Sequence, residues 1–544
     1  MPTKEILKFC LEKGLLIDRN FLQFLIENTD VESAKLIINQ VKSCSSQKII
    51  NQKCFDDSKE KICDFLFKLP EETQKKFEKL KIKLGLTLEI SREVEPVLEI
   101  KNFKNYLPEK LESSEGNVKV TDLPFFLGKK LEVKDFVTYF KNRFSEMSSI
   151  LQGHSELVNP VSIGKLSNLN SNVSIIGIVK DKNFTKNKNL IFEVEDLTGK
   201  IKILVNSNKK ELIEKAENVC LDGVFGFRVS RNREMLFANE IIFPDSFLQE
   251  KKYSPCDESV VFLGDLHYGS KRFLEKDFSN FIDYLNGKFK KDEGDYQKVK
   301  YLFLVGDLVT GIGNYPNQEK DLKIKDLEEQ FQGLADFFKK IRGDIKIIIS
   351  PGNHDGVRIM EPQPILDEKY AWPIYDLKNV ILTTNPARVN IGSDEKKSFN
   401  GFDILTYHGF SFTFYANNIP ELVKKRAMDC PEEIMKYLLR NRHLAPTHPS
   451  IQYFPLEQDP LLIKKIPDIF VSAHTHKSGV GYYNNTLIIS TSCWELMTPY
   501  QEKFGNKPDH CKVPLFNLKN RSVKILDFEN SDEKNEKNEG ENGN

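Results

Sequence analysis

The apolar positions of the chain change their period along its length, and each period predicts a different kind of domain. Over residues 1–85 they recur three and four positions apart, as at Ile6, Cys10 and Leu11, which is the period of amphipathic helices. We predict a helical N-terminal domain here, either a protein-contact head or a plain structural appendage. Over 86–130 the period disappears among Glu, Lys, Pro and Ser, which predicts a partly disordered linker.

The next two segments predict a helix followed by a barrel. Aromatic residues on one face predict a single connecting helix within residues 131–159. Residues 160–250 contain five strand-like segments with a helical segment between the third and fourth, which is the order of an OB-fold. Such barrels often bind single strands through aromatic and basic side chains. Four residues could serve in this way: Phe184, Arg228, Arg231 and Arg233. The alternative is a barrel that only packs against its neighbours.

Residues 258–528 alternate short apolar runs with helical segments, which is typical of an α/β layer structure. The apolar runs are continuous, as expected for strands covered on both faces. The last segment, 529–544, has almost no apolar residue, and we expect it to be disordered. The predicted fold class is therefore multidomain α/β.

Side chains that can bind metals follow nearly every predicted strand of 258–528. They are Asp265 and His267, then Asp307, then Asn353, His354 and Asp355, then His408, and last His474 and His476. Five of the nine histidines of the chain fall in these loops. Open α/β sheets place their ligands at the carboxyl ends of strands. Because alternate residues of an extended segment point the same way, we expect each D-x-H or H-x-H pair to face one site.

The predicted ligand set is oxygen and imidazole without thiolate. It suits two divalent ions, Mn²⁺ first, with Fe²⁺, Zn²⁺ or Mg²⁺ as alternatives. Asp307, on the second strand, is placed to bridge them, and two ions about 3.5–4 Å apart stabilise both the attacking and the leaving oxygen of a phosphoryl displacement. Asp355 has a simpler alternative role as the cap of the next helix.

Composition excludes several classes of protein. Lys and Arg equal Asp and Glu, at 79 each, so contact with nucleic acid would need local basic patches. Nine cysteines without a C-x-x-C pair argue against a zinc ribbon and against a secreted disulfide scaffold. No apolar run has the length of a membrane span, and the first residues lack a signal-peptide core. We expect a cytoplasmic protein.

The five blocks, in this order, resemble the calcineurin-like metallophosphoesterase superfamily over about 260–500, with Ala473 where that family usually has glycine. The segments around 439–447, 467–470 and 490–495, and the order of domains, resemble the small subunits of archaeal family-D DNA polymerases. That resemblance implies a 3′→5′ exonuclease that proofreads in DNA replication. It implies a large polymerase subunit, a DNA 3′ end and, through the complex, the sliding clamp as partners, at the nucleoid and without a membrane.

The resemblance also implies roles for residues. One ion would be held by Asp265, His267, Asp307 and His476, and the other by Asp307, Asn353, His408 and His474. His354 would stabilise the developing charge or protonate the leaving 3′ oxygen, with Asp355 orienting it. Three residues of the insertion before His474 would contact DNA: Arg440, Arg442 and His443. Two alternatives stay open, a stand-alone phosphoesterase or repair nuclease, and a polymerase scaffold without catalysis.

Overall fold

A computed structural model describes residues 2–28, 31–44, 49–50, 118–121, 130–168, 173–232, 235–248, 250–289, 294–503 and 505–529. The chain divides into two compact units, Met1–Phe103 and Lys104–Asn544, and each is described by itself. None of the helices in these described ranges is long and apolar enough to cross a membrane.

The described part of the first unit is helical, as the period predicts. Its elements are α1 (Pro2–Glu12), α2 (Arg19–Asn28) and α3 (Val31–Cys44), with two short parallel strands, β1 (Leu16–Ile17) and β2 (Ile49–Ile50). Phe21, Leu25, Ile37 and Ile38 are fully buried and form its core with their neighbours. The rest of the predicted helical domain, 51–85, lies outside the described residues.

The predicted barrel is present as a closed five-stranded sheet in the order β4-β5-β6-β8-β7. Its strands are β4 (Val173–Phe184), β5 (Leu190–Glu195), β6 (Lys200–Val205), β7 (Val224–Asn232) and β8 (Met235–Ile242), and α10 (Lys210–Glu217) joins the third to the fourth. In β5 every second side chain points into the barrel: Leu190, Phe192 and Val194 are buried, and the residues between them are partly exposed. This is the two-residue period expected of a strand with one buried face.

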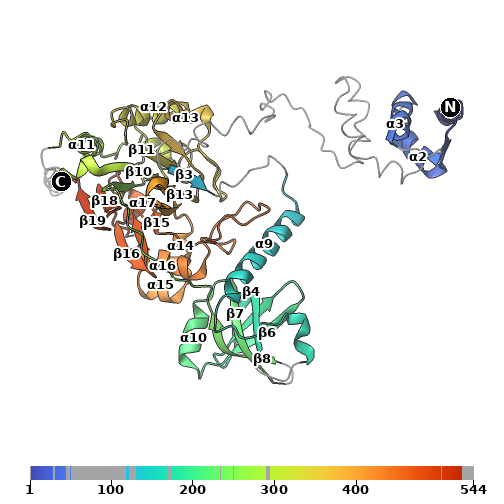
Figure 1. Cartoon of the computed structure of the whole chain (residues 1–544), viewed down its shortest axis with the longest axis horizontal. Helices are drawn as coiled ribbons and strands as arrows, with labels where there is room; N and C mark the ends of the chain where they lie inside the picture. Colours follow the sequence, from blue (N-terminus) through green and yellow to red (C-terminus); the bar gives the residue numbers. More distant parts are fainter. Residues whose placement is uncertain are drawn as a thin grey trace. The chain divides into compact units, whose positions relative to one another are not determined.

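Two six-stranded sheets stacked face to face form the largest part of the second unit (Figure 1). One has the order β12-β11-β10-β9-β18-β19 and the other β16-β17-β15-β14-β13-β3. The strands of the first are β9 (Ser259–Leu263), β10 (Val299–Val305), β11 (Lys346–Ser350), β12 (Val380–Leu382), β18 (Lys512–Asn517) and β19 (Val523–Asp527). Those of the second are β3 (Val118–Thr121), β13 (Ala387–Ile391), β14 (Phe402–Tyr407), β15 (Ile469–Ser472), β16 (Gly479–Tyr483) and β17 (Thr486–Ser490).

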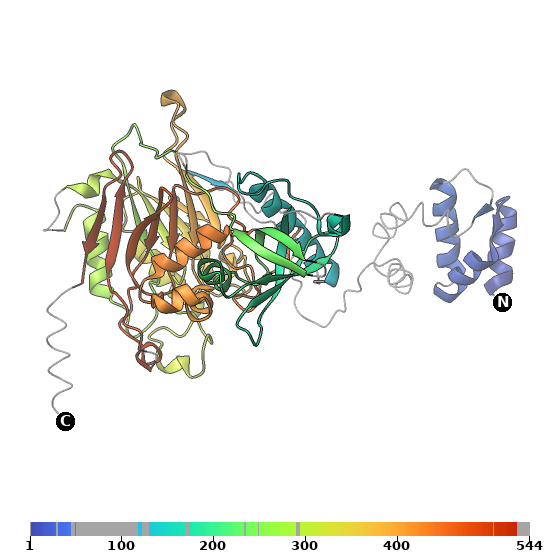
Figure 2. The ribbon, with the colours of Figure 1, turned by 90° about the horizontal axis from the view of Figure 1, so that it is seen from below.

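Both faces of each sheet are covered, which is why the strands read as continuous apolar runs. Phe262 and Phe303 face the second sheet, while Val261 and Leu302 face helices. The helices against the first sheet are α11 (Glu275–Leu285), α12 (Leu327–Phe338) and α13 (Glu368–Tyr375). Those against the second are α14 (Phe412–Asn418), α15 (Pro420–Lys424) and α16 (Pro431–Asn441), drawn in orange in Figure 2. The described residues also include α17 (Pro499–Lys503) and the 3₁₀ turns η1 (Ile163–Asn168), η2 (Asp295–Lys298), η3 (Gln318–Lys320) and η4 (Glu395–Lys397).

The strand β3 falls within the range predicted to be a linker, and there the prediction is wrong. Residues 118–121 pair antiparallel with β13 and complete the edge of the second sheet, with Val118 buried between the sheets. Only four residues of a polar stretch make this contact, too few to show a period in the sequence.

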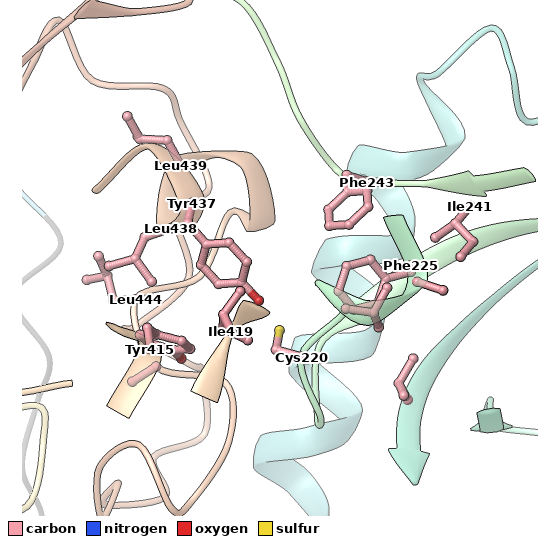
Figure 3. Close-up of a cluster of buried hydrophobic side chains, with 14 of the residues drawn as sticks. Cys220, Phe225, Ile241, Phe243, Tyr415, Ile419, Tyr437, Leu438, Leu439 and Leu444 are labelled. Carbon is pink, nitrogen blue, oxygen red and sulfur yellow. The ribbon is translucent and has the colours of Figure 1, made fainter. Parts of the chain in front are cut away.

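The barrel packs against the sandwich through one continuous apolar core. Figure 3 shows Cys220 and Phe243 of the barrel opposite Ile419 and Tyr437 of the sandwich. The predicted connecting helix is α9 (Val133–Gln152), which buries Tyr139 in the same core. The barrel therefore packs against the sandwich, and the alternative that it only packs stays a prediction.

Candidate metal centre

The topology gathers the predicted metal-binding side chains at one edge of the sandwich. Asp265 and His267 follow β9, Asp307 follows β10, and Asn353 to Asp355 follow β11. His408 follows β14, and His474 and His476 follow β15. Within each sheet these strands run parallel to one another, so their carboxyl ends lie at the same edge.

The D-x-H and H-x-H pairs were predicted to lie on an extended backbone, on which alternate side chains point the same way. That prediction of the backbone conformation is wrong, because these loops are not extended. Five of the residues adopt left-handed backbone conformations: Asp265 (φ 50°), His267 (φ 49°), Asp307 (φ 49°), His474 (φ 69°) and His476 (φ 57°). Left-handed conformations are uncommon for residues other than glycine and concentrate at functional sites. Such turns follow β9, β10 and β15 and help to bring the side chains together.

Two neighbouring groups of atoms result. In the first, Nε2 of His476 lies 3.1 Å from Nε2 of His267 and 3.8 Å from Oδ1 of Asp265. In the second, Nε2 of His408 lies 3.3 Å from Oδ2 of Asp307 and 3.0 Å from Oδ1 of Asn353, and 3.3 Å from Nδ1 of His474.

Asp307 lies between the two groups. Its Oδ2 is 3.9 Å from Nε2 of His267 and 3.9 Å from Nε2 of His354. Its Oδ1 accepts a hydrogen bond of 2.8 Å from the backbone N–H of His354. The approach of the loops needs a glycine, because a Cβ on Gly352 would lie 2.2 Å from Oδ1 of Asp307.

Burial determines the charge state of the histidines. It lowers the pKa of His267 to about 3 and that of His474 to about 3, and it holds the pKa of His476 well below its usual range. These three rings are therefore neutral at neutral pH, which is the form in which an imidazole nitrogen binds a metal ion. Burial opposes charge on His408 too, but attraction to Asp307 raises the pKa of His408 to about 10.

These residues fit divalent cations. Burial raises the pKa of the Asp265 carboxyl well above its usual range, and its Oδ1 is buried without a hydrogen-bond partner. A cation would satisfy that oxygen and restore its charge. Three sets of ligand atoms each lie within 4.8 Å of one another: Asp265, His267 and His476; His267, Asp307 and His354; and Asp307, His408 and His474. Asp307 belongs to two of them, and His354 to one.

Comparison with known proteins gives the family. Residues 260–480 match the family model of the DNA polymerase alpha/epsilon B subunits. The DNA polymerase II small subunit of Methanothermobacter thermautotrophicus is 37% identical over 402 residues, which are 73% of this chain and 80% of that protein.

The chain belongs to the archaeal DNA polymerase II small subunits. The subunits of Pyrococcus furiosus and Pyrococcus abyssi are 33% and 36% identical over 81% and 73% of this chain. The matches span 69% and 63% of those two proteins, so more than a third of the second lies outside the match. The solved structure of a novel archaeal phosphodiesterase aligns at 12% identity and a TM-score of 0.25, over 49% of this chain and 98% of that one. The predicted resemblance to the family-D small subunits is confirmed.

Asp355 is not the cap of a described helix, and its role in orienting His354 stays a prediction. Its side chain accepts hydrogen bonds from the backbone N–H of Val309 (3.0 Å) and of Gly352 (2.8 Å). Its side chain is buried, and burial with the neighbouring Asp307 raises its pKa to about 7. Asp355 therefore ties the loop of Asp307 to the loop of His354.

The prediction that Arg442 and His443 contact DNA is wrong, because both side chains are buried. Arg442 donates to the carbonyls of Ile463 and Lys464 and to Ser246, and His443 pairs with Asp459 at 2.8 Å. The third predicted residue, Arg440, forms an ion pair with Glu421 and lies over the rings of Phe243 and Tyr437. Arg440 therefore lies where the sandwich contacts the barrel.

The DNA-binding prediction for the barrel is not tested, but its residues are now placed. Phe184 is 57% exposed, whereas Arg228 forms a 2.9 Å ion pair with Glu240 on the next strand. The side chains of Arg231 and Arg233 lie outside the described part of the chain.

Four residues of the site were missed because no spacing marks them. The carbonyl of Thr310 accepts from Nδ1 of His354 (2.8 Å), from Asn314 (3.0 Å) and from Gln318 (3.0 Å). The Gln501 amide lies 2.8 Å from Nδ1 of His476. Because Nδ1 of His354 must carry the proton that it donates to Thr310, Nε2 is the nitrogen presented to Asp307.

Proposed function

We propose that the chain is a metal-dependent 3′→5′ exonuclease that proofreads for a large DNA polymerase subunit. The observation that carries the proposal is the three ligand sets gathered at one edge of the sandwich, two of which share Asp307, with Nε2 of His354 3.9 Å from Oδ2 of Asp307. Family membership supplies the polymerase context. The proposed ion sites are Asp265, His267, Asp307 and His476, and Asp307, Asn353, His408 and His474.

Divalent ions, Mn²⁺ first, would supply Lewis-acid stabilisation of a phosphodiester in displacement. The chain itself supplies position and one proton site. Asp307 is fixed from one side by the backbone N–H of His354, so the two loops keep a constant separation. His354 has its Nδ1 proton held by the Thr310 carbonyl. With a second proton on Nε2, the imidazolium would stabilise developing negative charge or give that proton to a leaving 3′ oxygen, which would leave the ring neutral.

The test removes the shared carboxylate with little change of shape. In Asp307→Asn we expect loss of bound metal by mass spectrometry, and loss of Mn²⁺-dependent digestion of a 3′-mismatched primer. The matched control is Asp336→Asn, which removes an exposed carboxylate paired with Lys339 on α12 and should change neither. Full activity and full metal content in Asp307→Asn would refute the shared-ligand assignment.

The partner side of the proposal is tested separately. A protein that begins at residue 104 retains β3 and the whole second unit, and we expect it to capture the purified large subunit. If capture needs residues 1–103, the docking surface has been placed in the wrong unit. A chain that captures the large subunit yet never hydrolyses DNA would favour the scaffold alternative. Hydrolysis without capture would favour the stand-alone nuclease.

A further inference from the structure

The loop that follows Asp307 is built onto the loop that carries His354. The Thr310 carbonyl accepts hydrogen bonds from the side chains of His354, Asn314 and Gln318. The Thr310 hydroxyl donates to the carbonyl of His267 at 2.7 Å. Gly311, at φ +70°, lies so close that a Cβ there would stand 2.1 Å from the carbonyl oxygen of His354. A change in the conformation of this loop would therefore alter the position of His354.

Two buried glutamines hold the loop rigid. Gln330 is fully buried and accepts from the N–H of Gly311 at 2.9 Å. Gln318, 1% exposed, accepts from the N–H of Asn314 at 2.9 Å. Between Gly311 and Gln318 lies an exposed segment, residues 312–317, which we call the crest. Because the backbone of the crest is already held in place, it loses little conformational entropy when a ligand binds to it.

The crest offers apolar surface beside the metal centre. Ile312 is 48% exposed and Tyr315 39% exposed, and the Tyr315 hydroxyl is tethered to Asp321 at 3.2 Å. The neighbouring cation, Arg272, is already paired with Asp321 at 2.6 Å. A further apolar side chain, Ile359, is 57% exposed and follows Asp355 on the other loop.

We propose that Tyr315, with Ile312 beside it, binds the base of the unpaired nucleotide at the 3′ end of the substrate. This inference rests on the proposed function for the class of substrate. Every base presents a π-face, so stacking on an aromatic side chain is tolerant of sequence. A paired base is stacked inside its duplex and cannot use the crest. The residue would thus select frayed or mismatched ends, and the rigid loop would hold the selected nucleotide next to His354.

The test measures binding without catalysis. The full-length chain, treated with EDTA, is titrated into a 5′-labelled tetrathymidylate, and into the same oligonucleotide with an abasic 3′-terminal nucleotide. We expect Tyr315→Ala to weaken binding of the normal oligonucleotide by roughly 5- to 150-fold, the range typical of one stacked base. It should not weaken binding of the abasic one. Tyr315→Phe keeps the ring and should bind like the wild type.

The matched control is Tyr253→Ala, which removes an exposed tyrosine located before β9, at the end opposite Asp265. It should leave both affinities unchanged. Equal affinity of wild type and Tyr315→Ala for the normal oligonucleotide, or equal losses on both oligonucleotides, would overturn the proposal. Digestion with Mn²⁺ then separates the two hypotheses. A ring-dependent affinity in a wild-type chain that does not cut DNA would leave base binding standing and refute the exonuclease.

Discussion

The buried ion pair between Arg143 and Asp459 is predicted to hold α9 on the sandwich. Nε of Arg143 lies 2.7 Å from Oδ2 of Asp459, and both side chains are fully buried. Tyr139 donates to the other carboxylate oxygen at 2.7 Å, and His443 approaches at 2.8 Å. The guanidinium also donates to the carbonyls of Asp222 in the barrel and Pro446 in the sandwich, so one side chain joins three parts of the unit.

The perturbation is Asp459→Asn, which leaves the Arg143 charge buried without a counter-charge. Removing one partner of a buried pair costs about 3–5 kcal/mol. Asparagine keeps one oxygen that can accept from Tyr139 or Arg143, so we expect the lower end, about 3 kcal/mol. If that loss appears as local opening, backbone amides of α9 should exchange roughly 100-fold faster than in the wild type.

Hydrogen exchange with mass spectrometry over 133–152 measures the effect directly. The matched control is Glu146→Gln on the same helix, because Glu146 forms a half-exposed pair with Lys464 at 3.2 Å. Exposed pairs contribute at most about 1 kcal/mol, so exchange should rise less than roughly fivefold. Combining Asp459→Asn with Arg143→Met removes both charges, and the double variant should lose less than the sum of the single losses. Exchange in Asp459→Asn equal to that in Glu146→Gln would refute the reasoning.

Three further predictions concern the site and its support. His354→Ala should keep its metal content while mismatch removal falls about 10²–10⁴-fold, whereas Asn353→Ala should lose metal; equal metal loss in both variants would make His354 a ligand. Gly311→Ala should reduce exonuclease activity far more than Gly313→Ala, since both have positive φ but only Gly311 faces the carbonyl of His354; equal activities would show that the contact does not matter. Burial lowers the pKa of His443 to about 4 from its ordinary 6.5, so the unfolded chain takes up the proton first and stability is lost as pH falls from 6.5 towards 4. Urea midpoints at pH 7 and pH 5 should therefore differ less in His443→Gln than in the wild type, and an unchanged difference would contradict this assignment.

The sequence predicted the fold class and the clustering of the metal-binding residues because both depend on local signals. Apolar runs with both faces covered identify the central strands, and polar residues directly after Leu263, Val305 and Ser350 must then lie at one edge. Arg442 and His443 were misplaced because their burial depends on contacts with segments distant in the sequence, such as Ser246 for Arg442 and Asp459 for His443. The packing of the barrel on α16 is a contact between distant segments, and no local pattern shows it.

The backbone of the metal centre indicates what the fold contributes to the chemistry. Five site residues other than glycine have positive φ, and each such residue costs of the order of 1 kcal/mol or more. Strain of this kind persists only where surrounding contacts determine the conformation. Such contacts are present in the site, because the backbone N–H of His474 donates to Asp265 at 2.8 Å and that of His354 donates to Asp307 at 2.8 Å. Two site carboxylates thus bind the backbone of the loops that carry the histidines. The fold therefore contributes hydrogen bonds of its own that hold these strained loops in position.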